Sequence, residues 1–324
     1  MRDPTKMFSF GLSLMLYNGS RKWWTILNLL TAPITFFVNA PFGRFTPKDQ
    51  SSIFVVDGIK SWIVMELVSP ITFLYTFITS PLTFQAPPLP SLTERHAILA
   101  ICFLVHYANR ALLSPLRTPS RSKTHIVVPL GGMFFNINNG YLLGSYLSSP
   151  YARMYLQTLP LSTFYGGLAL WAVGLAGNIW HDEILLNIRR KANSKGKGKA
   201  DGSSKGEHYA IPQGGLYSLI SYPNYFCEWI EWLGFAIAAA PLPCKPSSLR
   251  PSSFLPLLLN PKIYLDIWNT PAQNFAPNLS PPWIFFISEV VLMFPRAYQG
   301  HKWYLEKFGD AYPKQRKVVV PFLI

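Results

Sequence analysis

Seven stretches of about 20 mostly apolar residues constrain this chain more than any other feature of its sequence. They cover roughly residues 22–40, 61–83, 97–114, 126–147, 162–186, 216–240 and 281–298. A helix of about 20 residues crosses the apolar part of a bilayer, and helices satisfy their own backbone hydrogen bonds in lipid. The sequence therefore predicts an all-α integral membrane protein with about seven transmembrane helices.

The composition excludes several other classes of protein. Charged residues make up 14% and hydrophobic residues 49% of the 324 residues, whereas soluble proteins contain about 25% charged residues. A net charge of +14 raises the possibility of a nucleic-acid partner. However, the Lys and Arg residues lie between the apolar stretches rather than on one amphipathic face. The three cysteines fit neither a disulfide framework nor a metal site, and no Rossmann or P-loop motif is present.

The basic residues also predict how the chain is oriented in the membrane. They concentrate in the connectors after the first, third and fifth stretches and in the C-terminal tail. Because cytosolic segments carry the excess of Lys and Arg, we expect a lumenal N-terminus and a cytosolic C-terminus. Residues 193–206 are rich in Lys, Gly and Ser and are expected to form a disordered cytosolic insertion. Residues 241–282, rich in Pro and Ser, are expected to form an irregular lumenal loop.

Polar side chains inside the apolar stretches are the candidate functional residues. A charge at the centre of a membrane helix costs about 2.5–3.5 kcal/mol. We therefore expect each charged side chain in these stretches to pair with another group or to have a function. Glu66 follows Trp62 by one helical turn, and Tyr107 and Arg110 end the third stretch. The structural alternatives are a carboxylate paired with a neighbouring helix and an arginine that extends to the lipid headgroups.

Two further polar stripes follow helical spacing. Asn178, Asp182 and Arg189 occupy close to three turns of one helix face. The second stripe consists of Asn224, Glu228, Glu231 and Trp232. We expect the stripes to face a shared interior. Their amides, carboxylates and cations suit a ligand with phosphates and a carboxamide better than a simple ion, and helices rather than a Rossmann turn would hold it.

Three C-terminal segments resemble the steroid 5α-reductase family. They read GNIWHDEILLNIRR, YAIPQGGLYSLISYPNYFCEWIEWLGFAIA and RAYQGHKWYLEKFGDAYPKQRKVVVPFLI. The N-terminal half resembles the family more weakly, through the FGRFT segment that begins at Phe42, through Trp62 and Glu66, and through the segment from His106 to Arg110.

The resemblance implies an enzyme of the endoplasmic reticulum membrane that uses NADPH to reduce the double bond of an enone, typically a 3-oxo-Δ4 steroid. It implies that Glu66 and Tyr107 bind the substrate carbonyl. Glu66 is expected to donate to this oxygen in its protonated form. The residues implied for the cofactor are Trp62, Arg110, Asn178, Asp182, Arg189, Tyr209, Asn224, Glu228 and Tyr304. Residues 1–160 would form much of the substrate side and residues 161–324 the NADPH-binding region, with no obligate protein partner.

Departures from the family leave the substrate open. Met65 precedes Glu66 where the family often has Gln, and Phe42 stands where a Tyr is expected. An Arg often found early in the fourth helix is replaced within residues 130–132. Competing interpretations are a polyprenol, enoyl-thioester or secondary-metabolite enone reductase. An isoprenylcysteine methyltransferase and a non-catalytic sterol-binding membrane protein also remain.

Overall fold

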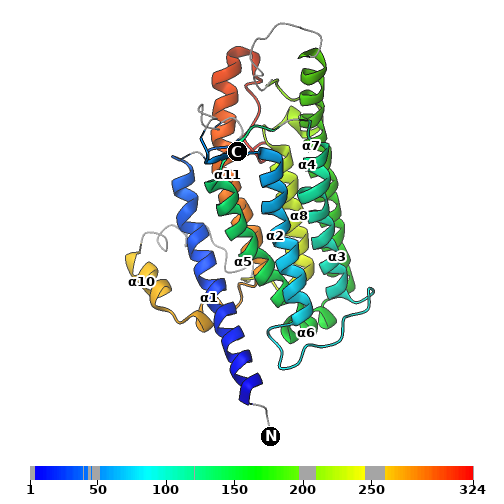
Figure 1. Cartoon of the computed structure of the whole chain (residues 1–324), viewed down its shortest axis with the longest axis vertical. Coiled ribbons are helices and arrows are strands. Elements are labelled where there is room, and N and C mark those ends of the chain that lie inside the picture. Colours follow the sequence, from blue (N-terminus) through cyan, green and yellow to red (C-terminus); the bar gives the residue numbers. More distant parts are fainter. Residues whose placement is uncertain are drawn as a thin grey trace.

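Each of the seven apolar stretches overlaps a long helix in the computed structural model of the chain. The structure describes residues 4–38, 40–42, 45, 52–119, 121–196, 209–244 and 260–323. The long helices are α1 (Pro4–Thr35), α2 (Gly58–Thr79), α3 (Arg95–Tyr107), α5 (Val127–Ser148), α7 (Leu161–Gly196), α8 (Pro223–Ala239) and α11 (Pro281–Phe308). Figure 1 shows them as an elongated bundle, with α1 and α11 at one side and α3 and α7 at the other.

Shorter elements connect the long helices. A π-helical segment, η2 (Ala108–Leu113), and α4 (Ser114–Arg117) continue α3, and the other short helices are α6 (Pro150–Thr158) and α10 (Pro261–Asn269). Single 3-10 turns are η3 (Gly215–Ser218), η5 (Ala272–Asn274) and η6 (Gly309–Ala311). Strands β1 (Val55–Val56) and β2 (Thr124–His125) pair antiparallel. The described residues thus contain one two-stranded sheet and no Rossmann sheet.

Glycines bring the helices of two pairs into close contact. A Cβ atom at Gly174 on α7 would lie 2.3 Å from the backbone nitrogen of Glu231 on α8. A Cβ at Gly140 on α5 would lie 2.4 Å from the backbone oxygen of Ser69 on α2. Small residues allow membrane helices to pack backbone against backbone. The α7–α8 and α2–α5 pairs therefore bring together the side chains that flank these glycines.

The bundle is apolar on its outside as well as in its core. Phe73, Phe103 and Trp232 are fully buried at its centre. Large apolar side chains such as Ile71 and Phe134 are exposed, which is the distribution expected where lipid is the solvent. By length and composition, two helices of the described part qualify as membrane spans, Gly58–Thr79 and Arg95–Arg117. A third qualifies if α6 and α7, which meet at a bend of 108°, form one broken span. The prediction of seven spans is not confirmed.

Some boundaries and one segment differ from the sequence-based expectation. Helix α1 begins at Pro4 rather than near residue 22, because the mostly apolar residues 7–17 belong to the same helix. The expected irregular loop contains α10, which Asn260 caps by accepting from the backbone nitrogen of Lys262 at 3.0 Å. Of the predicted insertion, residues 193–196 belong to α7 and residues 197–206 lie outside the described residues.

Candidate active site

The polar stripes of α7 and α8 contact one another directly. The Nδ2 atom of Asn178 donates to the backbone oxygen of Asn224 at 3.0 Å and to Oε2 of Glu228 at 3.3 Å. The Nδ2 atom of Asn224 donates to Oδ1 of Asp182 at 3.0 Å. The close approach at Gly174 allows this contact. The structure therefore brings together four of the residues predicted to surround a cofactor.

Arg110 joins this ladder to α2. Its Nε atom lies 3.1 Å from Oε1 of Glu66, and its Nη1 atom lies 3.0 Å from Oε1 of Glu228. The two carboxylates are 4% and 3% exposed, and buried carboxylates persist only where they are paired. Trp62 donates from Nε1 to the backbone oxygen of Arg110 at 3.3 Å. Arg110 lies in the π-helical segment η2, a local irregularity that is frequent at functional sites.

Two asparagines of α5 hold Tyr107. Asn139 donates from Nδ2 to the Tyr107 hydroxyl at 2.9 Å and to Oγ of Ser69 at 3.3 Å. Asn136 donates to the backbone oxygen of Met65 at 2.8 Å, while its Oδ1 atom lies 3.5 Å from the Tyr107 hydroxyl. The Tyr107 oxygen is thus fixed by Asn139, and Ser69 also lies within hydrogen-bonding reach of the hydroxyl, beside the long contact to Asn136. These contacts hold the hydroxyl between α2, α3 and α5.

A second buried pair lies behind Tyr107. Nδ1 of His106 lies 2.7 Å from Oε1 of Glu231, and the two side chains are 4% and 0% exposed. The other carboxyl oxygen of Glu231 has no hydrogen-bond partner among the described residues. The His106 ring also contacts the Tyr107 ring, with centroids 5.1 Å apart. This pair connects α3 to α8 and supports the backbone that carries Tyr107.

Arg121 lies at the end of the bundle where α2 begins, and the charges of three further arginines act on it. Cζ of Arg121, in the connector between α4 and β2, lies 3.7 Å from the centroid of the Trp62 ring. Burial lowers the pKa of Arg121 to about 10, and the positive charges of Arg189, Arg110 and Arg296 act in the same direction. Guanidinium groups bind phosphates through charge-assisted hydrogen bonds. The site therefore fits a phosphate-bearing ligand.

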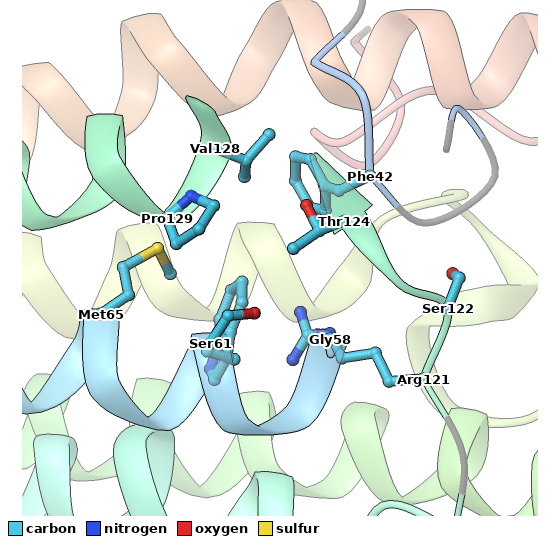
Figure 2. Close-up of a pocket in the computed structure, with 10 residues that line it drawn as sticks. Phe42, Gly58, Ser61, Met65, Arg121, Ser122, Thr124, Val128 and Pro129 are labelled. Carbon is cyan, nitrogen blue, oxygen red and sulfur yellow. The ribbon is translucent and has the colours of Figure 1, made fainter. Parts of the chain in front are cut away.

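A small cavity of about 20 Å³ lies between α2, α5 and this connector. Figure 2 shows Met65 reaching from α2 toward Pro129 on α5, with Arg121 at the other side of the cavity. A Cβ atom at Gly132 would lie 2.1 Å from Sδ of Met65. Phe42 lines the same space. Two of the departures noted in the sequence, Met65 and Phe42, therefore meet at one cavity, which is about large enough for one water molecule.

Tyr209 and Tyr304 lie in another group of contacts. The Tyr209 ring contacts the Trp303 ring at a centroid distance of 4.8 Å, and the Tyr304 ring stacks on Tyr312 at 5.3 Å. These contacts join the end of α11 to the segments before η3 and after η6. Neither of these ring contacts involves Arg110. The role of the two tyrosines in cofactor binding stays a prediction.

Sequence reasoning missed four side chains of the site: Asn136, Asn139, Arg121 and Arg296. The asparagines lower the apolar character of the fourth stretch, which was a detectable signal. The arginines resemble ordinary connector and helix-end charges until their neighbours are known. Among the described residues, no group of three or more His, Cys, Asp or Glu side chains is placed to hold a metal ion.

Comparisons with known proteins cover most of the chain. A family model described as 3-oxo-5-alpha-steroid 4-dehydrogenase matches residues 121–246 and 273–324 and leaves out the residues between them. The chain is 37% identical to an uncharacterized protein of Schizosaccharomyces pombe, over 96% of this chain and 100% of that protein. It is 32% identical to 3-oxo-5-alpha-steroid 4-dehydrogenase 1 of Rattus norvegicus, over 89% and 87% of the two chains. It is 28% identical to Steroid 5-alpha-reductase DET2 of Solanum lycopersicum, over 89% of each chain.

Proposed function

The chain belongs to the 3-oxo-5-alpha-steroid 4-dehydrogenase family and is a membrane oxidoreductase that acts on a CH–CH group, and from this premise we propose that it reduces the C=C bond of an enone lipid with NADPH. The proposed substrate is a 3-oxo-Δ4 steroid, which would be reduced to its 5α product. Family membership disfavours the methyltransferase and the non-catalytic sterol-binding protein.

The observation that carries this proposal is the arrangement of Tyr107 beside the Glu66–Arg110 pair. Asn136 contacts both the Tyr107 hydroxyl and the backbone of Met65, which is the neighbour of Glu66. A buried hydroxyl that two asparagines hold in place therefore lies next to a buried ion pair. That arrangement supports binding of a carbonyl oxygen at this point.

In the proposed reaction, the enone oxygen accepts a hydrogen bond from Tyr107 while hydride adds to the β-carbon. Negative charge moves onto the carbonyl oxygen as the enolate forms, and fixed donors in a water-excluded site stabilise that charge. The positive charge of Arg110 acts in the same direction. The α-carbon then takes a proton from Tyr107 or from water.

The ion pair changes one expectation about Glu66. The sequence predicts a protonated Glu66 that donates to the carbonyl, whereas in the structure Glu66 accepts from Nε of Arg110 at 3.1 Å. We therefore assign the first donor role to Tyr107. Glu66 then holds Arg110 in place through their ion pair.

The residues at the site fit NADPH, which supplies the hydride when it is bound. Arg121, Arg189 and Arg296 offer guanidinium groups for its phosphates. The amides of Asn178 and Asn224, with the Glu228 carboxylate, form a polar wall on the adjoining helices. This division supports the assignment of the cofactor to residues 161–324 and of the carbonyl to residues 1–160, with Arg110 and Arg121 contributed by the N-terminal region.

The apolar lining near Glu66 favours a substrate with a rigid hydrocarbon skeleton. Met65, Val128 and Pro129 form the apolar side of the cavity, while Ser61, Thr124 and Arg121 form its polar side. A steroid ring would pack on the apolar side, against carbon and sulfur. A polyprenol, an enoyl thioester or a secondary-metabolite enone is the competing substrate class. Side chains around the cavity must move to admit any of these, because ligand pockets hold about 300–1,000 Å³.

We also propose that the protein crosses the endoplasmic reticulum membrane seven times. Support comes from the seven long helices, from their exposed apolar side chains and from the basic connectors. Polar residues on α5, α8 and α11 that lower the hydropathy of these helices are buried against neighbouring helices, as Asn139, Glu228 and Glu289 are. Hydropathy alone therefore understates how well these helices suit the bilayer.

Product analysis on microsomes that contain the protein tests this function. With NADPH and a panel of enones, we expect a 3-oxo-Δ4 steroid to yield its 5α-dihydro product with matching NADPH consumption. Preferred turnover of an enoyl thioester or a prenyl enone would change the substrate class, and no NADPH oxidation with any enone would contradict the proposal. In the same sealed microsomes, a C-terminal reporter should be accessible to added protease, and a protected reporter contradicts the proposed orientation.

A further inference from the structure

Helix α10 is an amphipathic helix that lies outside the bundle. None of its nine residues is buried, and Figure 1 shows it beside α1 rather than among the packed helices. Its apolar residues are Ile263, Tyr264, Leu265, Ile267 and Trp268. At 100° per residue they occupy roughly 200° of the helix circumference, while Lys262, Asp266 and Asn269 share the opposite side. This pattern is typical of a helix that lies along a polar–apolar boundary.

Two buried cations of α1 hold the segment that contains α10. Nζ of Lys22 donates to the backbone oxygens of Trp268 and Thr270 at 2.6 and 2.7 Å. Nη2 of Arg21 donates to the backbone oxygens of Ala276 and Leu279 at 2.8 and 3.0 Å. Lys22 and Arg21 are 4% and 6% exposed. These bonds satisfy two charges of a membrane helix with carbonyl groups and fix the position of α10 along α1.

The family model does not include the segment that forms this attachment. The family model matches residues on both sides but leaves out residues 247–272, which include all of α10. The helix is therefore not required by the shared fold. The shared fold therefore does not explain why α10 is amphipathic or why it is hydrogen-bonded to α1.

The apolar face of α10 continues an apolar surface of α1. The rings of Trp23 and Trp268 meet edge to face with centroids 4.8 Å apart, and both side chains remain about half exposed. Exposed Leu27 and Leu30 follow on α1 toward the other end of the bundle. Tryptophans concentrate where a membrane protein passes from headgroups to acyl chains. An apolar surface that is shared by two helices and contains a tryptophan pair therefore fits a lipid bilayer.

We propose that α10 lies in the boundary between headgroups and acyl chains, on the side of the membrane that holds the α8–α11 connection. Its apolar face contacts the acyl chains, its Lys262–Asp266 side faces the headgroups and water, and Lys22 and Arg21 tether it to α1. The helix thus anchors α1, the outermost of the helices that pack on α11, at a fixed depth in the membrane. This inference does not depend on the identity of the substrate.

Fluorescence quenching at two neighbouring positions tests the proposal. In a Cys244→Ser background, which removes the exposed cysteine, Leu265→Cys and Asp266→Cys place an environment-sensitive label on the apolar and the polar side of α10. Both residues are exposed, so the substitutions leave the packed bundle unchanged. The full-length protein is reconstituted in phosphatidylcholine vesicles. The background protein without a new cysteine corrects for label at Cys102 and Cys227.

We expect brominated phosphatidylcholine to quench the Leu265→Cys label at least twofold more than the Asp266→Cys label, and aqueous iodide to show the reverse order. Equal quenching of both labels by iodide, with none by brominated lipid, would mean that α10 lies in water and would overturn the proposal. Protection of the Leu265→Cys label from both quenchers would indicate a protein contact and would also overturn it. Dilution with unlabelled protein would then identify a second copy as the partner.

Discussion

At the scale of single residues, Arg110 connects three parts of the site. It pairs with Glu66 on α2 and with Glu228 on α8, and its backbone oxygen accepts from Trp62. The π-helical segment that holds it begins directly after Tyr107. The change from α-helical to π-helical repeat after Tyr107 thus brings the Tyr107 hydroxyl and the Arg110 guanidinium to one site.

Loss of Arg110 should destabilise the protein, because it leaves two buried carboxylates without their cation. Breaking a buried pair by removing one partner costs about 3–5 kcal/mol of stability. Because Arg110 is partly exposed, we expect Arg110→Gln to lower the free energy of unfolding by an amount near the lower end of this range. Thermal unfolding in detergent measures it. The matched control is Arg117→Gln, which breaks the exposed Arg117–Glu183 pair and should cost about 1 kcal/mol or less. Equal shifts of the unfolding temperature in both variants would show that Arg110 is not a buried anchor.

At the scale of elements, the α7–α8 pair depends on glycines that leave no room for a side chain. Gly174→Ala should destabilise the protein by about 1–3 kcal/mol, the usual range for overpacking, since its Cβ would meet the backbone of α8 at 2.3 Å. On the same helix, Gly166 has no heavy atom within 4 Å of an added Cβ. Gly166→Ala should therefore be neutral or slightly stabilising. Thermal unfolding of the two variants in detergent distinguishes them, and equal stability would contradict the close packing of α7 on α8.

Elements with a strong local signal were predictable from the sequence. Long apolar stretches locate the seven long helices, and spacing within one helix shows that Asn178 and Asp182 share a face. Helix α10 was missed because nine residues between proline-rich segments give little periodicity, and because its role depends on Lys22, more than 200 residues earlier. The start of α1 was missed because glycines and polar residues interrupt its apolar pattern.

The candidate site was predictable only where its residues repeat along one helix or match a family motif. Glu66 and Glu228 stand out as charges in apolar stretches. Their common partner Arg110 could not be assigned, because contacts between helices that are distant in sequence leave no local pattern. The same reason hides Asn139, whose bond to Tyr107 joins α5 to α3.

At the scale of the whole molecule, the polar side chains of the long helices lie inside a bundle whose outer surface is largely apolar. Arg121 lies near the start of α2, at the end that we propose to be cytosolic, and the residues proposed to bind the carbonyl lie deeper in the bundle. At the opposite side, Lys22 and Arg21 hold the segment around α10. This polarity suits an enzyme that takes a charged cofactor from the cytosol and a lipid substrate from the membrane.

The most direct test of the account is the turnover of a 3-oxo-Δ4 steroid by Tyr107→Phe in microsomes with NADPH. Removal of one donor to a developing oxyanion typically lowers kcat by about 10²–10³, so we expect this variant to lose most activity, as Glu66→Ala should. Glu66→Gln should keep part of it. Tyr75→Phe, which removes an exposed hydroxyl from the outer face of α2, should retain full activity. Full turnover by Tyr107→Phe would contradict the assignment of the carbonyl site.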